Sequence, residues 1–106
     1  MKVELNEALT KLSLKNATFL SVFNHGTLAV EIYKPDQIDY QKPHTRDEVY
    51  VIISGSGTFY NNGLNTTFSS GDFLFVKAGH VHRFENFTED FATWVIFYGP
   101  EGGETE

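Results

Sequence analysis

From Ala17 onward, apolar and β-branched residues come in short runs that turn-forming residues separate at close spacing. The clearest turn signals are Asn24-His25-Gly26, Asn61-Asn62-Gly63 and Ser69-Ser70-Gly71. The pattern predicts eight strands, at residues 17–24, 27–34, 48–54, 57–61, 64–69, 73–77, 80–86 and 91–98. Eight short strands with almost no helix predict an all-β fold. We expect a closed barrel or jelly roll, because closure removes the unpaired edges of a flat sheet.

The length of 106 residues supports one domain with a single core. Residues 1–16 are expected to form an N-terminal segment with one short turn of helix, capped by Asn6. The helical spacing that predicts it belongs to Leu5, Ala8, Leu9 and Leu12. Residues 17–99 are expected to form the β-barrel. Residues 100–106 are rich in Gly and Glu, and we expect them to be a flexible tail.

The charge pattern narrows the range of partners. The formal net charge is −6, and the eight basic residues are scattered singly, so we expect neither nucleic acid nor a membrane as a partner. A small-molecule ligand or another protein is the better candidate. The absence of cysteine excludes disulfides and thiolate metal sites. The sequence shows no cationic apolar leader and no membrane-spanning apolar run, so we expect a cytoplasmic location.

Two pairs of polar residues are each spaced by four: His44 with Glu48, and His82 with Asn86. Residues an even number apart on a strand point to the same face, so each pair can converge on one point. On the second strand, Arg83 and Glu85 belong in water, which predicts that His82 points inward. Two imidazoles and one carboxylate form the triad that divalent transition metals bind while keeping open coordination positions. These residues therefore predict a metal site.

The same residues resemble the two signature motifs of the cupin superfamily. The first motif is matched by Lys42-Pro43-His44, Glu48 and Gly55, and the second by Gly71, Lys77, Gly79, His82 and Asn86. The resemblance implies a double-stranded β-helix, a small jelly-roll barrel with the metal inside it. By position it implies that His44, Glu48 and His82 are ligands and that Asn86 braces the site. Gly55 and Gly79 also stand where the chain must turn sharply between strands.

The sequence departs from the family pattern at two positions: Lys77, where the family usually has proline, and Lys42, where it usually has another histidine. The change at Lys42 affects the ligand set. Lysine is a poor ligand at neutral pH because its amine is protonated. Three possibilities follow: a three-ligand site, a fourth ligand or nearby supporting group from Gln41 or His80, or no metal. Lys42 itself is either a pocket residue that neutralises an anionic substrate or a solvated loop lysine. The donor set does not choose among Fe, Mn, Ni and Zn.

Four aromatic residues are candidates for the pocket wall, although core packing is the favoured explanation for each of them. They are Tyr50, Phe84, Trp94 and Tyr98. The apolar character of residues 48–54 on both faces, together with the aromatic 91–98 segment, indicates buried outer surface. We therefore expect a homodimer.

Three functions fit the sequence. The first is a metal-dependent enzyme on a small oxygen-rich metabolite, of the dioxygenase, isomerase or lyase type that the resemblance implies. The second is a non-catalytic module that binds a sugar or an organic acid. The third is a barrel in which the metal is purely structural. The fold alone does not choose among them.

Overall fold

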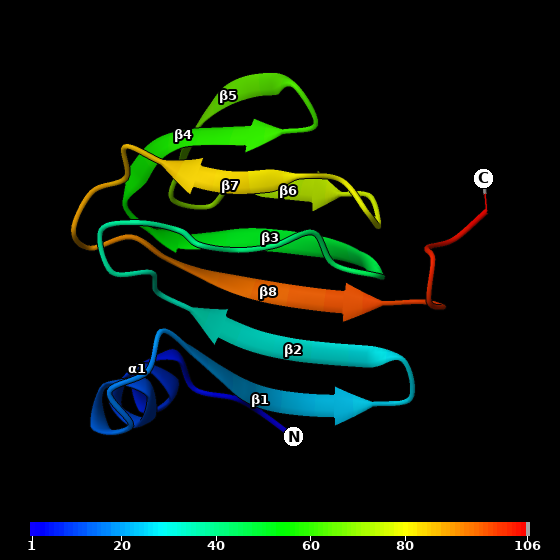
Figure 1. Ribbon diagram of the computed structural model, residues 1–106. Coiled ribbons are helices and arrows are strands. Elements are labelled where there is room, and N and C mark those ends of the chain that lie inside the picture. The colour runs from blue at the N-terminus through cyan, green and yellow to red at the C-terminus, as the bar shows by residue number, and fades with distance from the viewer. Residues whose placement is uncertain (106) are drawn as a thin grey trace.

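The structure is a computed structural model that describes residues 1–105. In this part of the chain one helix is followed by eight strands, and Figure 1 shows how they are arranged. The elements are α1 (Leu5–Leu14), β1 (Phe19–His25), β2 (Leu28–Tyr33), β3 (Asp47–Ser54), β4 (Ser56–Asn61), β5 (Leu64–Ser69), β6 (Phe73–Val76), β7 (His82–Glu85) and β8 (Ala92–Tyr98). All eight predicted strands are therefore confirmed, with ends that agree to within two residues.

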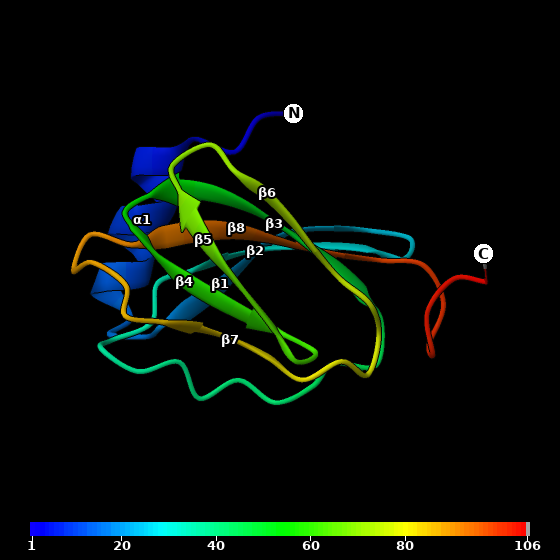
Figure 2. The ribbon, with the colours of Figure 1, turned by 90° about the horizontal axis from the view of Figure 1, so that it is seen from above.

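The strands form two antiparallel sheets. The larger has the order β1-β2-β8-β3-β6, and the smaller has the order β5-β4-β7. Both views show the smaller sheet lying against the β3 side of the larger one (Figures 1 and 2). This arrangement is the jelly roll predicted from the sequence.

The main core lies between the two sheets. Tyr50 and Ile52 of β3 meet Phe59 of β4, Phe84 of β7 and Val95 of β8, and all five side chains are buried. The alternation of a strand explains this inward face, because Glu48, Tyr50 and Ile52 lie two residues apart. The same alternation places Glu48 in the layer of buried side chains. The sheet therefore carries the candidate ligand into the interior.

The helix α1 covers part of the outer face of the larger sheet. Its buried residues Ala8 and Leu12 pack with Ile32 of β2, and Trp94 and Ile53 border the same cluster. The short N-terminal helix predicted from the sequence is confirmed, but it is longer than the expected single turn, and Asn6 does not cap it. The helix has ten residues, Glu4 is its N-cap residue, and no side chain caps it. Burial of the apolar stripe, which begins at Leu5, selects this earlier start.

The corner between β3 and β4 requires glycine. Gly55 has φ +86°, and a Cβ atom there would lie 2.6 Å from Cα of Phe91. No other residue fits such an approach between backbones. Gly79 also has a positive φ, of +82°, in the turn before β7. The prediction of sharp turns at both glycines is confirmed.

Residues 100–104, expected to belong to a flexible tail, are hydrogen-bonded to the rest of the chain. The backbone N–H of Gly102 donates to the carbonyl of Thr45 at 2.7 Å, and that of Glu104 donates to Oδ2 of Asp47 at 2.9 Å. Oδ1 of Asp47 accepts from the N–H of Ala78 at 2.9 Å. Asp47 thus joins the tail to the turn before β7. Glu106, the last residue of the expected tail, lies outside the described residues.

Replacing Asp47 with asparagine is expected to lower the free energy of unfolding by about 1 to 3 kcal/mol at pH 7. Backbone hydrogen bonds from Glu104 and then Ala78 hold the pKa of Asp47 below its usual range. The ionised carboxylate therefore stabilises the fold above its unfolded pKa of about 3.9, and this stability is lost as the pH falls through the folded pKa.

Urea unfolding of both proteins at about pH 7 and about pH 3 checks this, and the difference between them should shrink at the lower pH. Asp36→Asn is the control, because Asp36 is exposed. A difference of the same size at both pH values would contradict the role given to the Asp47 charge.

Two aromatic residues of β6, Phe73 and Phe75, remain 66% and 46% exposed. They would be available to the homodimer expected from the sequence, which stays a prediction. Among residues 1–105, no helix has the length and apolar character needed to cross a membrane.

Candidate metal centre

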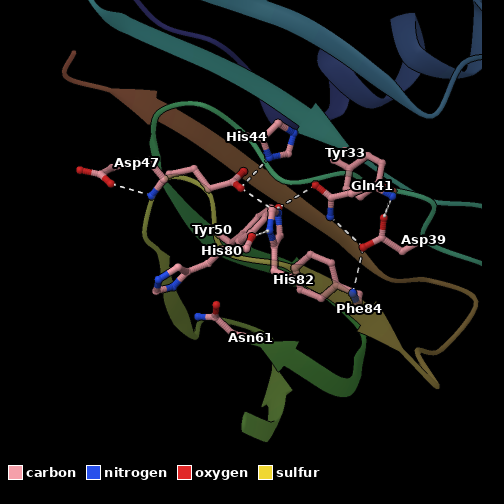
Figure 3. Close-up of polar contacts among 12 residues, drawn as sticks. Tyr33, Asp39, Gln41, His44, Asp47, Tyr50, Asn61, His80, His82 and Phe84 are labelled. Atoms are coloured by element: carbon pink, nitrogen blue, oxygen red, sulfur yellow. Dashed lines mark hydrogen bonds and ion pairs between the residues drawn. The ribbon is translucent and has the colours of Figure 1, made fainter. Parts of the chain in front are cut away.

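Three side chains from separate elements meet at one buried point. His44 comes from the connection between β2 and β3, Glu48 from β3, and His82 from the start of β7. One donor atom from each lies within 4.8 Å of the other two, so the cluster could hold a metal ion. The rings of His44 and His82 lie beside each other in Figure 3, with centroids 5.2 Å apart. The predicted convergence of these residues is present in the structure.

The distances within the cluster suit a common ion. Oε1 of Glu48 lies 2.9 Å from Nδ1 of His44 and 2.8 Å from Nε2 of His82. Two ligands about 2.1 Å from a metal, at right angles to each other, are separated by about 3.0 Å. The second oxygen, Oε2 of Glu48, is buried without a hydrogen-bond partner. A buried carboxylate oxygen without a partner is costly, and a bound cation would satisfy it. The donor set therefore fits a divalent metal.

A backbone carbonyl determines which ring nitrogen of His82 is available to bind a metal. Nδ1 of His82 lies 2.9 Å from the carbonyl oxygen of His80. A carbonyl can only accept, so Nδ1 carries a proton and donates it. With a metal in the site, Nε2 of the neutral ring can offer its lone pair to the ion beside Glu48. Without a metal, Nε2 can carry a proton that it donates to Glu48. This support of the ligand nitrogen by a backbone carbonyl is typical of metal-binding histidines.

The charges in the cluster stabilise one another. Burial acts to raise the pKa of Glu48, but the hydrogen bonds from His44 and His82 outweigh burial and lower it. Burial acts to lower the pKa of His82, but the hydrogen bond to Glu48 and its negative charge raise it. The side chains of Glu48 and His82 are both inaccessible to solvent. Glu48 is thus an anion inside the barrel, held there by groups that carry or share positive charge.

A chain of hydrogen bonds anchors the loop before β3 to the site (Figure 3). The Tyr50 hydroxyl lies 3.1 Å from Nε2 of His82 and donates to Oε1 of Gln41 at 2.9 Å. Nε2 of Gln41 donates to Oδ2 of Asp39 at 2.7 Å, and the backbone N–H of Phe84 donates to the same oxygen at 2.8 Å. The loop is therefore bonded to both sheets at once.

Asp39 was not identified from the sequence. It is 93% buried and also accepts a hydrogen bond of 2.6 Å from the Tyr33 hydroxyl. Burial and this contact with Asp39 raise the pKa of Tyr33. A lone aspartate in a loop between prolines carries no signal that distinguishes it from a solvated one. Only the fold reveals its four hydrogen bonds.

His44 connects the cluster to a pocket of about 670 Å³. The pocket opens between β2, β8 and the β2–β3 connection, and Tyr33, Val95 and Phe97 form part of its wall. His44 is the member of the cluster with an exposed side chain, at 34%. A larger hollow of about 930 Å³ lies between α1 and residues 87–89, away from the three ligands. A ligand in the smaller pocket would reach the cluster through His44.

The remaining sequence candidates lie at different places. Gln41 contacts the site, but its oxygen accepts from Tyr50. His80 contributes its backbone carbonyl. Lys42 is exposed, as expected of a solvated loop lysine. Asn86 is exposed beyond the end of β7, with φ +52°, and shares no recorded hydrogen bond with the three ligands. The strand ends before Asn86, so the even spacing no longer carries it to the face of His82.

Of the four wall candidates, Tyr50 and Phe84 are fully buried core residues. Trp94 was expected at the pocket, but it packs in the cluster under α1, on the opposite face of β8. Tyr98 shares that face by alternation, and Val95 and Phe97 line the pocket instead. The strand is apolar on both faces because α1 covers one of them, so its composition could not identify the inner face.

Glu31 is a second pocket residue that the sequence reasoning missed. It lies in the middle of β2, opposite Val95, and lines the pocket together with His44. The signal was available, because a glutamate interrupts the apolar run Leu-Ala-Val-Glu-Ile-Tyr. Burial raises the pKa of Glu31, the Glu48 charge adds to this rise, and His44 opposes it.

Comparisons with known proteins agree with this fold. The chain is 30% identical over 99 residues to the uncharacterized protein SCO3923 of Streptomyces coelicolor, covering 92% of this chain and 94% of that one. Protein NMB1881 from Neisseria meningitidis has a similar structure, with a TM-score of 0.72, 16% identity and coverage of 93% and 100%. A cupin-2 domain protein from Shewanella frigidimarina has a TM-score of 0.67, 17% identity and coverage of 92% and 94%.

The family model described as "Cupin domain" matches residues 29–98, from β2 to the end of β8. The match includes His44, Glu48 and His82, which the fold brings together. It spans more than half of the chain, and the structural neighbours have the same jelly roll. This protein therefore belongs to the cupin family.

Proposed function

We propose that His44, Glu48 and His82 hold one divalent transition metal, and that the protein is a metal-dependent enzyme acting on a small oxygen-rich metabolite. The observation that carries this proposal is the meeting of three donor atoms at a buried point beside a pocket. A purely structural metal would not need a pocket that one of its ligands lines. Fe, Mn, Ni and Zn all accept two imidazoles and a carboxylate.

The chemistry follows from the donor set. A metal held by three protein ligands keeps positions open, where it can polarise a carbonyl or bind a chelating oxygen pair. The residues of this chain supply the surroundings. The His80 carbonyl orients the ring of His82. Tyr50 and Gln41 are hydrogen-bonded to each other beside the site. The apolar side chains of Val95 and Phe97 line one side of the pocket and keep water from it.

We expect the Fe(II)-loaded protein to consume oxygen with at least one member of a panel of diketones, enols and thiols. The Zn- or Mn-loaded protein is tested for isomerisation or elimination of the same compounds by NMR. Glu48→Ala should abolish any activity, because it removes the anionic ligand from the buried site. Glu85→Ala is the matched control, since Glu85 lies on the outer side of β7. Activity that survives in Glu48→Ala would contradict the proposal.

A second function, a non-catalytic binding barrel, is favoured by one observation. The two imidazoles and Glu48 lie at hydrogen-bond distances that a shared proton can also satisfy. The Tyr50 hydroxyl, 3.1 Å from Nε2 of His82, completes such a network. Tight ligand binding with no turnover of any compound in the panel would support this second function.

A further inference from the structure

We infer that the pocket beside His44 takes a small organic cation, and that Glu31 is the residue that recognises its positive charge. This inference deepens the proposed function and rests on it for one point, the placing of the ligand next to the metal site. It concerns the part of the ligand that lies away from the cluster. An oxygen of the same ligand can face His44 while its cationic group lies against Glu31.

Strand register places Glu31 on the inner face of the larger sheet. Glu31 pairs with Val95 of β8, and Val95 pairs with Tyr50 of β3. The three residues form one row across the sheet, beside the row in which Glu48 pairs with Phe97. A row of the inner face that contains buried Tyr50 and Val95 is an unusual place for a carboxylate.

Within the described part of the chain, the charge of Glu31 has no partner. Among residues 1–105, its carboxylate takes part in no recorded hydrogen bond or ion pair with another side chain. Glu31 is half-buried, and burial is the main cause of its raised pKa. The charges that shift its pKa belong to His44, which lowers it, and Glu48, which raises it. A desolvated carboxylate without a cation is destabilising, so a cationic ligand would be stabilised there.

The walls around Glu31 suit a cation with an apolar surface. Phe19, Tyr33, Tyr40 and Phe97 line the same pocket. Aromatic faces carry negative electrostatic potential and attract ammonium groups, most strongly where water is excluded. Phe19 and Tyr40 are 56% and 80% exposed, which places them at the mouth of the pocket. Exposed aromatic residues around a carboxylate attract the positive charge of the ligand. They also provide an apolar surface against which its methyl groups can pack.

The other charges of the pocket exclude an anion at this end. Asp36 is the second carboxylate in the lining, and neither lysine nor arginine is among the described residues that line it. Lys42, which the sequence suggested as a partner for an anionic substrate, is exposed and is not a lining residue. An anionic group beside Glu31 would be repelled. An uncharged group would leave the carboxylate unpaired.

The test compares three probes of nearly equal shape, each followed by amide chemical shifts in ¹⁵N–¹H spectra. The probes are choline, its uncharged isostere 3,3-dimethylbutan-1-ol, and the anion 3,3-dimethylbutanoate. The quaternary nitrogen of choline has no lone pair, so a preference for it cannot come from metal ligation. We expect choline to bind about fivefold to thirtyfold more tightly than the isostere, and to shift pocket residues such as Phe19 and Gln41. The anion should bind most weakly.

Glu31→Gln keeps the size of the side chain and removes its charge, so the affinities for choline and the isostere should become equal within about twofold. Glu89→Gln is the matched control, because Glu89 lines the other hollow, and it should leave the ratio unchanged. Equal affinities in the natural protein, a ratio that survives Glu31→Gln, tighter binding of the anion, or no choline-induced shift at the pocket would each overturn the inference.

The same titrations, repeated with and without bound zinc, separate this inference from the proposed function. A choline preference in a protein that takes up no metal would support the role of Glu31 and contradict the proposed metal site. Stoichiometric metal uptake without any choline preference supports the metal site and overturns the role of Glu31.

Discussion

His82→Ala is expected to abolish uptake of a divalent metal. The natural protein should bind about one ion per chain when reconstituted with Zn or Fe(II) and freed of excess metal, and the variant should bind almost none. The reason is geometric. His82 supplies the nitrogen nearest to Glu48, at 2.8 Å, and the His80 carbonyl holds that ring in position. Only two ligands would remain, one of which, His44, is partly exposed. Elemental analysis of the desalted protein measures the result.

Two further variants distinguish the loss of a metal ligand from a general loss of folding. His25→Ala is the control, because His25 is an exposed histidine at the end of β1 and lies outside the cluster. It should keep full metal content. His44→Ala removes a ligand whose side chain is partly exposed on the pocket side, and it should also lose the metal. Metal content near one per chain in a folded His44→Ala or His82→Ala protein, as judged by circular dichroism, would refute the assigned ligands.

Phe84→Ala is expected to lower the free energy of unfolding by about 3 to 5 kcal/mol. Phe84 is 1% exposed and lies at the centre of the aromatic core. Its ring centroid is 4.8 Å from that of Tyr50, 4.7 Å from that of Phe59 and 4.6 Å from that of Phe91. Removal of the ring leaves a cavity between the two sheets, and the surrounding rings can close it only in part. Urea unfolding followed by fluorescence measures the change.

The matched control for Phe84 is Phe73→Ala, since Phe73 is 66% exposed on the edge strand β6. We expect the control to change the free energy of unfolding by about 1 kcal/mol or less. Comparable losses in the two variants would mean that the space between the sheets is not the main source of stability. Phe84→Ala should also weaken metal binding, because Tyr50 packs on its ring and contacts His82.

Local chemistry explains why the strands could be predicted. Asn62 and Gly63 both have positive φ, of +49° and +91°, and these values match a two-residue hairpin turn between β4 and β5. Such turns depend on a few adjacent residues. They can therefore be predicted from the local sequence without knowledge of the rest of the fold. The helix was underestimated because its length depends on packing against β1 and β2. An isolated ten-residue helix is only marginally stable.

The three residues predicted as ligands do lie together in the fold, whereas much of their surroundings was not predicted. His44, Glu48 and His82 carry the spacing and the motif, so they could be identified without coordinates. Asn86 carried the same motif, but β7 ends before it and leaves it exposed. Trp94 was a candidate for the pocket wall, whereas the pocket face of β8 belongs to Val95 and Phe97. A one-residue error along a strand reverses the face of every side chain.

The sequence by itself determined the number of strands, the turns that separate them and the three residues that could bind a metal. These properties depend on neighbours in the chain or on regular spacing within one strand. The tertiary structure alone decided that Asp39 joins the two sheets and that Glu31 faces the pocket of His44. Both positions depend on the register between strands that are far apart in the chain. That register is set by burial of a whole sheet face, which no local pattern contains.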